Sequence, residues 1–126
     1  MGVTVGIDLV DLAAVREGLA AHGERYLRRW CTERELDQCV RDGVPDVPEL
    51  GQRLAAKEAA AKALRAEGAL PWTSIEVLRS PGERVELTLG AEAARLAGDR
   101  GLGRFDVTTT TEDEMAAAFV VATETT

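Results

Sequence analysis

An alanine-rich stretch in the middle of the chain, from Arg53 to Leu64, most constrains the fold. Six of its twelve residues are alanine, the strongest helix former, and the others are two leucines and four charged residues. The pattern predicts a helix that begins near Pro48 and ends near Glu67. Because most helical stability in proteins comes from tertiary packing, we expect the other elements to be arranged around this helix.

Glu58 and Lys62 lie four residues apart in this stretch and therefore on one face of the expected helix. The helix alone leaves two interpretations open. In the first, the two residues form an exposed ion pair worth roughly 0.3 kcal/mol. In the second, Glu58 binds a divalent cation while Lys62 and Arg53 bind phosphate. The second interpretation needs another carboxylate from elsewhere in the chain.

The composition is that of one acidic globular domain, which we expect to span residues 1–126. The formal net charge of −7 argues against nucleic acid as the main partner. No apolar run is long enough to cross a membrane, and no signal peptide is evident, so we expect a cytoplasmic protein without a membrane partner. Cys31 and Cys39 are too few for a disulfide framework or a zinc site and are expected to be packing thiols.

The order of the expected elements indicates an α+β fold with a mostly antiparallel sheet. Asp8 lies inside an apolar first strand, where a carboxylate is costly unless a partner is present. Thr32 to Glu35 fits a capping box at the start of a helix. The expected elements are a strand at 3–10, helices at 12–21, 24–30, 32–41 and 48–67, a hairpin of 74–79 with 84–89, a helix at 91–100, and strands at 104–111 and 116–123.

Three arginines, Arg25, Arg28 and Arg29, are spaced i, i+3 and i+4 within the expected helix at 24–30. A solvated helix face is one interpretation of this spacing. The other is a landing site for an acidic partner, because locally gathered positive charge attracts such a partner even on an acidic protein.

Four motifs occur together and in order along the chain. They are Gly6-Ile7-Asp8-Leu9-Val10, Thr32-Glu33-Arg34-Glu35-Leu36, the stretch from Arg53 to Ala63, and the segment from Ala116 to Ala122. Together they resemble the holo-acyl carrier protein synthase type of phosphopantetheinyl transferase over almost the whole chain. This resemblance implies that family's fold, β-α(3)-β2-α-β2 with the sheet packed against a long central helix.

The resemblance also implies a reaction, in which the 4′-phosphopantetheine arm of coenzyme A is transferred to a serine of an acyl carrier protein. Adenosine 3′,5′-bisphosphate is the other product. By resemblance, Asp8 and Glu58 bind Mg²⁺, and Asp8, Glu58 and Lys62 are the catalytic residues, with Glu58 as the candidate base. The family is typically a trimer with coenzyme A between subunits, which implies a homotrimer here.

The coenzyme A contacts follow from the same resemblance, and the carrier-protein contacts rest on the charge and spacing of the arginines. The expected coenzyme A contacts are Arg53, Lys57, Lys62, Arg65, Thr109 and Thr111. The expected carrier-protein contacts are Arg16, Arg25, Arg28 and Arg29.

The chain also departs from the family's pattern. Thr111 stands where the family has a histidine, and we expect this position to tolerate substitution. Arg65 stands at a usual glycine position, where it adds a phosphate contact or obstructs the cleft. Ala14 replaces an arginine that members often use for the carrier protein, and Arg16 is a partial substitute.

Three accounts therefore stay open. In the first, the chain is an active transferase that serves a different carrier protein, such as one of a polyketide or other specialised pathway. In the second, it is a weak or inactive relative that binds coenzyme A or a carrier protein without modifying it. The third account is a small acidic interaction protein with no active site.

Overall fold

The computed structural model describes residues 2–68, 70–82 and 84–125. The elements are β1 (Val3–Asp11), α1 (Leu12–His22), α2 (Glu24–Trp30), α3 (Glu33–Cys39), β2 (Val40–Arg41), β3 (Val44–Pro45), α4 (Val47–Leu64), a 3-10 turn η1 (Trp72–Ser74), β4 (Ile75–Arg79), β5 (Val85–Leu89), α5 (Ala91–Asp99), β6 (Leu102–Glu112) and β7 (Met115–Glu124). Every recorded strand pairing is antiparallel, so the predicted α+β class is confirmed.

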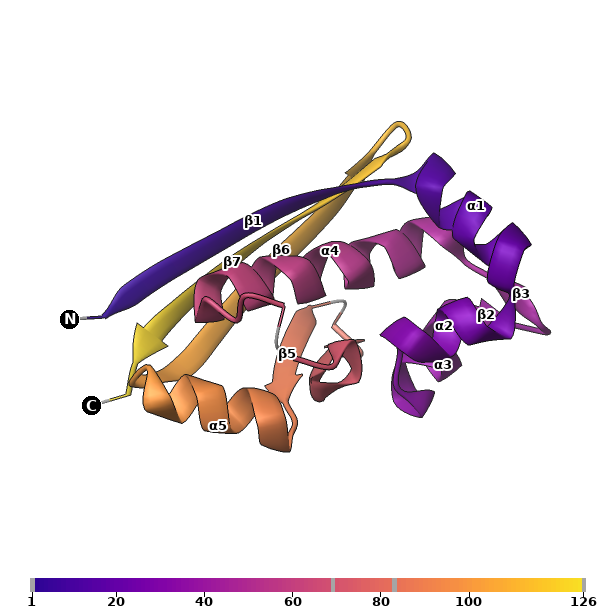
Figure 1. The fold of residues 1–126 in the computed structure, drawn as a ribbon. Helices are drawn as coiled ribbons and strands as arrows, with labels where there is room; N and C mark the ends of the chain where they lie inside the picture. The colour runs from indigo at the N-terminus through magenta and orange to yellow at the C-terminus, as the bar shows by residue number, and fades with distance from the viewer. Residues whose placement is uncertain (1, 69, 83, 126) are drawn as a thin grey trace.

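The long helix α4 lies against a three-stranded sheet with the order β1-β7-β6 (Figure 1). Five of its six alanines, all except Ala61, belong to a buried cluster that also contains Ala118 and Val120 of β7. The contact is very close at Gly6 of β1, where an added Cβ would lie 1.9 Å from the carbonyl oxygen of Ala59. Small residues on both elements therefore fix how near the helix comes to the strand that carries Asp8.

The core continues on the other side of α4. Ile75 and Val77 of β4 and Ala93 and Ala97 of α5 belong to the same buried cluster as the α4 alanines. A second cluster joins α1, the Cys31 segment and the first half of α4 through Val15, Leu50 and Leu54. The helix is thus enclosed along most of its circumference, which holds its few accessible positions rigidly.

A fully buried ion pair ties α4 to the elements beside it. Lys57 Nζ donates to Glu35 Oε1 of α3 at 2.8 Å and to the carbonyl oxygens of Trp72 and Ile75. The other oxygen of Glu35 accepts from the Val77 amide of β4 at 2.8 Å. Since both charges are buried and hydrogen-bonded, removing one partner would leave the other uncompensated, at a cost of about 3–5 kcal/mol.

The predicted capping box is present. Thr32 accepts from the Glu35 amide, and the Glu35 side chain accepts from the Thr32 amide. The helix ends at Cys39, earlier than predicted, because Val40 and Arg41 are extended and pair with Val44 and Pro45. Asp42 and Gly43, both with positive φ, make the two-residue connection. Asp-Gly is a strong hairpin signal, and the sequence analysis missed it.

The two cysteines are free and buried, as predicted. Burial raises the pKa of the Cys31 thiol to about 12 and that of Cys39 to about 11, so both are poor nucleophiles. In the described part of the chain, no helix combines the length and apolar character needed to span a bilayer.

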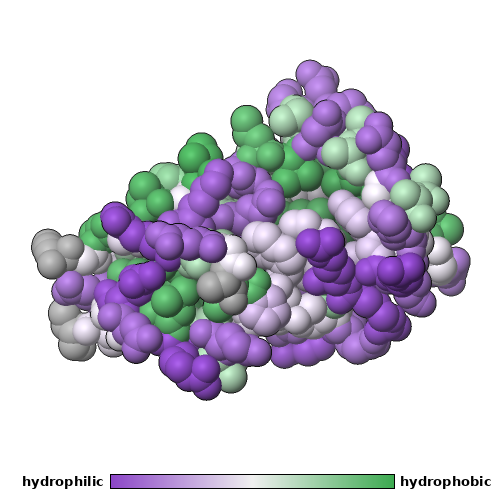
Figure 2. All heavy atoms as spheres, viewed as in Figure 1, coloured by the Kyte–Doolittle hydropathy of each residue, from purple (hydrophilic) through white to green (hydrophobic). Residues whose placement is uncertain are grey.

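The outer face of the sheet is exposed and apolar. Val3, Val5, Ile7 and Leu9 point outward from β1 and are each more than half exposed, and Phe119 of β7 adds to them. Figure 2 shows hydrophobic side chains gathered along the edge where β1 runs. An antiparallel sheet normally has a polar outer face, so this surface is unusual for a free one.

Candidate active site

The structure brings Asp8, Glu58 and Lys62 together in one pocket. Asp8 faces inward from β1 toward α4, which carries Glu58 and Lys62. Lys62 Nζ donates to Asp8 Oδ1 at 2.8 Å and to the Ile7 carbonyl oxygen at 3.0 Å. The pocket has a volume of about 380 Å³ and is also lined by Arg65, Trp72 and the segment from Ala66 to Gly68.

The two carboxyl groups of the pocket are held in an electrostatically unfavourable arrangement. Burial, followed by the neighbouring Asp8 carboxylate, raises the pKa of Glu58 to about 8, against a smaller lowering effect of Lys62. Asp8 Oδ2 is buried and has no hydrogen-bond partner within the described residues. Two neighbouring carboxyl groups, one of them with an oxygen that lacks a partner, suit a cation that both can bind.

The residues of the pocket suit a hard divalent cation that takes only one or two of its ligands from the protein. The described residues contain no group of three or more histidine, cysteine or acidic side chains suited to a metal. A cation here would therefore take its remaining ligands from water and from a bound molecule, which is the usual arrangement for Mg²⁺ beside substrate phosphates.

Arg65 is held at the rim of this pocket by the end of α4. It has a φ of 56°, in the left-handed region that favours glycine. The Arg65 amide donates to the Lys62 carbonyl oxygen at 3.1 Å, and the Ala66 amide donates to that of Ala61 at 3.0 Å. This Schellman arrangement ends the helix at Leu64 rather than near Glu67, so the predicted end was three residues too late.

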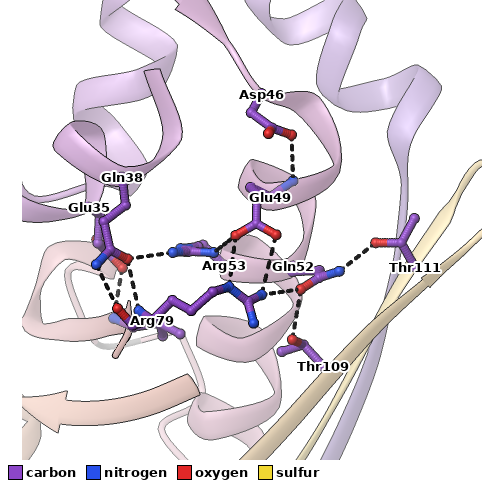
Figure 3. Close-up of polar contacts among 10 residues, drawn as sticks. Glu35, Gln38, Asp46, Glu49, Gln52, Arg53, Arg79, Thr109 and Thr111 are labelled. Carbon is purple, nitrogen blue, oxygen red and sulfur yellow. Dashed lines mark hydrogen bonds and ion pairs between the residues drawn. The ribbon is translucent and has the colours of Figure 1, made fainter. Parts of the chain in front are cut away.

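Arg53, Thr109 and Thr111 lie outside this pocket, in a separate polar cluster (Figure 3). Arg53 is only 1% exposed and donates to Glu49 Oε1 at 2.5 Å and to Gln38 Oε1 at 2.6 Å. Thr109 and Thr111 of β6 are both bonded to Gln52 of α4. Within one chain, the expected coenzyme A contacts thus fall into two groups.

Lys57 is in neither group. Its ammonium donates three hydrogen bonds to protein acceptors inside the core, so it has none left for a ligand. Its observed role is structural, and we assign it no coenzyme A contact.

The four arginines expected to meet a carrier protein are not equivalent. Arg16 is bonded to Glu114, and Arg28 to Glu24 and Glu33. No ion pair of Arg25 or Arg29 is recorded in the part of the chain that the structure describes. These two arginines line a pocket of about 520 Å³ together with His22, Tyr26 and Trp30. The predicted three-arginine patch is therefore reduced to two uncompensated charges.

Both tryptophans connect the two surfaces. Trp30, beside Arg25 and Arg29, stacks on Trp72 of the acidic pocket with ring centroids 4.7 Å apart. The sequence analysis assigned neither of them to a site, although Pro71-Trp72 follows the central helix closely. It also missed Gln52 and Arg79, since no local pattern marks a glutamine or a strand arginine as part of a polar cluster.

Known proteins are similar to this chain over most of its length. The family model for the 4′-phosphopantetheinyl transferase superfamily matches residues 4–120. A holo-[acyl-carrier-protein] synthase from Salinispora arenicola is 38% identical, with 97% of this chain and 98% of that protein covered. The corresponding protein of Bordetella pertussis is 35% identical, with 93% and 80% covered.

Solved structures are similar as well. A holo-[acyl-carrier-protein] synthase from Neisseria meningitidis has a TM-score of 0.82 at 27% identity, with 94% of this chain and 96% of that chain covered. A coenzyme A complex of the Chronobacterium ammoniagenes protein has a TM-score of 0.83 at 25% identity, with 100% of both chains covered.

These matches define the class of the protein. The chain belongs to the 4′-phosphopantetheinyl transferase superfamily. Within that superfamily it is an enzyme of the holo-acyl carrier protein synthase type.

The raised pKa of Glu58 makes the stability of the metal-free protein depend on pH. Between pH 4.5 and about 8 the folded chain holds a proton on Glu58 that the unfolded chain has released, so stability falls as pH rises through this window. We expect Glu58→Gln to reduce this fall, with the largest gain in melting temperature over the unchanged protein near pH 9. Thermal unfolding from pH 5 to 9 with a chelator would measure it. If the two proteins differed in melting temperature by the same amount at every pH, the raised pKa of Glu58 would be contradicted.

Proposed function

We propose that this chain transfers the 4′-phosphopantetheine arm of coenzyme A to a serine of an acyl carrier protein. The observation that carries the proposal is the pocket in which Asp8, Glu58 and Lys62 meet. Relatives named holo-[acyl-carrier-protein] synthase and a similar structure solved with coenzyme A support it.

In the proposed reaction the serine oxygen attacks the phosphorus of the phosphopantetheine arm. The bond from that phosphorus to the bridging oxygen of the pyrophosphate breaks, and adenosine 3′,5′-bisphosphate leaves. Mg²⁺ held by Asp8 and Glu58 would neutralise the phosphate charge that moves onto the leaving group. Lys62, whose side chain is largely exposed, can turn from Asp8 to a phosphate oxygen. Glu58 accepts the serine proton, directly or through water.

We include a trimer in the proposal. The coenzyme A contacts fall into two groups within one chain, and a second copy would bring the Thr109 and Thr111 group of one subunit to the acidic pocket of another. The exposed apolar face on β1 and β7 supports this, because a free surface of that kind favours burial against a partner. We also propose a cytoplasmic location, which suits two free cysteines.

An inactive relative is the second candidate function. Two features favour it: Arg65 lines the pocket at a usual glycine position, and Thr111 replaces a histidine. Intact-mass measurement of several apo-carrier proteins, of fatty-acid and polyketide type, after incubation with coenzyme A and Mg²⁺ would distinguish the two. A phosphopantetheine-sized gain that a chelator abolishes supports the transferase. Coenzyme A binding without any gain supports the inactive relative.

Removal of either carboxylate should abolish transfer. Asp8→Ala and Glu58→Ala are each expected to lower kcat/KM by at least about a thousandfold, roughly 4 kcal/mol of transition-state stabilisation, because the cation would lose half of its protein ligands. The mass gain of the carrier over time is the measurement, and a circular dichroism spectrum controls for folding. Transfer within about tenfold of normal by both variants would rule out the proposed metal pair.

The two uncompensated arginines should matter more for carrier-protein use than the paired ones. We expect Arg25→Glu/Arg29→Glu to raise the KM for the carrier protein about tenfold or more, because it reverses two charges that would meet an acidic partner. Coenzyme A affinity should stay constant. Arg16→Glu is the control, since Glu114 already neutralises that arginine, and it should have a smaller effect. An equal loss of coenzyme A affinity in the double variant would place these arginines in the nucleotide site.

The apolar outer face should control assembly. A charge at Ile7, which is 63% exposed in one chain, would be buried in the trimer, so Ile7→Glu is expected to shift the protein to a monomer and to abolish transfer. Light scattering coupled to size-exclusion chromatography measures the mass. Val44→Glu is a matched control, because Val44 is equally exposed at 66% but lies on the β2-β3 hairpin. A monomeric unchanged protein with full activity would remove the trimer from the proposal.

A further inference from the structure

Gln52 lies at the centre of the polar cluster between α4, β4 and β6. Its Oε1 accepts from Arg79 Nη2 at 2.9 Å and from Thr109 Oγ1 at 2.8 Å, while its Nε2 donates to Thr111 Oγ1 at 2.7 Å (Figure 3). One amide therefore joins a strand arginine to two threonine hydroxyls on another strand.

The partners of Gln52 fix which way its amide faces. A guanidinium group can only donate, so the atom next to Arg79 has to be the amide oxygen. The amide nitrogen then faces Thr111 and can only donate to it. As a result, a lone pair of the Thr111 oxygen is already used, and its own proton has to point elsewhere. Among the described residues, no acceptor for that proton is recorded.

Arg79 is itself held firmly, which makes this orientation a property of the fold. Its Nε donates to Glu49 Oε1 at 3.1 Å, and its Nη2 donates to Glu49 Oε2 at 3.2 Å. Its backbone amide donates to Gln38 Oε1 at 2.8 Å, and its carbonyl oxygen accepts from Gln38 Nε2 at 2.9 Å. The series from Glu49 through Arg79 and Gln52 to Thr111 thus ends in a hydroxyl whose proton is free and polarised by its neighbours.

The cluster contains two guanidinium groups that a phosphate could meet, Arg53 and Arg79, which share the carboxylate of Glu49. Asp46 lies beside Glu49 and accepts from its amide, so these donor groups rather than a net charge are what the cluster offers an anion. The Nε of Arg53 is buried and has no recorded hydrogen-bond partner within the described residues. Thr111 is half-buried, so part of its side chain reaches the surface beside Gln52.

We propose that Gln52 is a positioning residue that turns the Thr111 hydroxyl into an oriented donor for a phosphate oxygen of coenzyme A. The inference rests on the proposed function, because it takes the ligand from there. Two phosphate sources share this chemistry, the 3′-phosphate of the ribose and the pyrophosphate. It revises the expectation that Thr111 tolerates substitution, since this hydroxyl has a dedicated support.

The test is a double-mutant cycle on the KM for coenzyme A. Thr111→Val keeps the shape and removes the hydroxyl, and it should raise this KM about tenfold to a hundredfold, the usual effect of a hydrogen bond to a charged group, with kcat within about twofold. Gln52→Met should raise it less, because the hydroxyl remains but turns freely. Gln52→Met/Thr111→Val should be no worse than Thr111→Val alone. Thr111→Ser should restore the normal KM.

Controls separate this role from a merely structural one. Thr88→Val makes the same change at an exposed strand threonine and should leave the KM unchanged. Repeating Thr111→Val with dephospho-coenzyme A distinguishes the phosphates: loss of the mutational effect assigns the contact to the 3′-phosphate, and an undiminished effect assigns it to the pyrophosphate.

Several results would overturn the inference. The first is a normal KM for coenzyme A in Thr111→Val. The second is a KM in the double variant that equals the product of the two single effects. The third is that Gln52→Met and Thr111→Val lower the melting temperature but leave the KM unchanged. Absence of transfer by the unchanged protein would instead count against the proposed function. In that case the same set of variants is compared by the Kd for coenzyme A, measured by titration calorimetry. The inference is overturned as well if no variant binds coenzyme A or if all variants bind it equally.

Discussion

The close approach of α4 to β1 is the constraint on which the rest of the structure depends. Gly6 leaves no space for a side chain against Ala59, and buried alanines line the helix where it meets the sheet. Because no large side chain separates the two elements, the backbone positions from which Asp8 and Glu58 project are fixed relative to each other. The Lys57–Glu35 pair fixes the opposite side of α4 against α3 and β4. A site for a small cation needs this rigidity, since its ligands have little freedom in distance.

The same helix divides the functional residues between two surfaces. Glu58 and Lys62 face the acidic pocket, whereas Gln52 faces the strand threonines. The proposed trimer would bring the two surfaces together. One copy would contribute the ligands of the cation, and its neighbour would contribute the hydrogen-bond donors to phosphate. Trimer assembly would then complete the site, and the apolar outer face of the sheet would be needed for activity because it would hold the subunits together.

The sequence predicted most of the fold because its signals were local. Helix propensity, strand alternation and the Thr32–Glu35 capping box identified the main elements within a few residues of their ends. What it missed depends on long-range contacts or on backbone conformation. The burial of Lys57 depends on Glu35, which lies in another helix. Ion pairs with distant or neighbouring carboxylates neutralise Arg16 and Arg28. The joint position of Asp8 and Glu58 came from the family resemblance, since no single-segment pattern relates a strand to a helix fifty residues away.

The enclosure of α4 bears on how such an enzyme can diverge. From Gly51 to Leu64 only Gln52, Glu58, Ala61 and Lys62 are not buried, and we assign three of these four to ligand binding or its support. This part of α4 therefore has almost no position at which a substitution would be without effect. A larger residue at a buried position would clash with the core, and a different residue at an accessible position would alter ligand binding. We therefore expect a change of partner preference to arise from exposed positions of α1, α2 and the strand ends rather than from this part of α4.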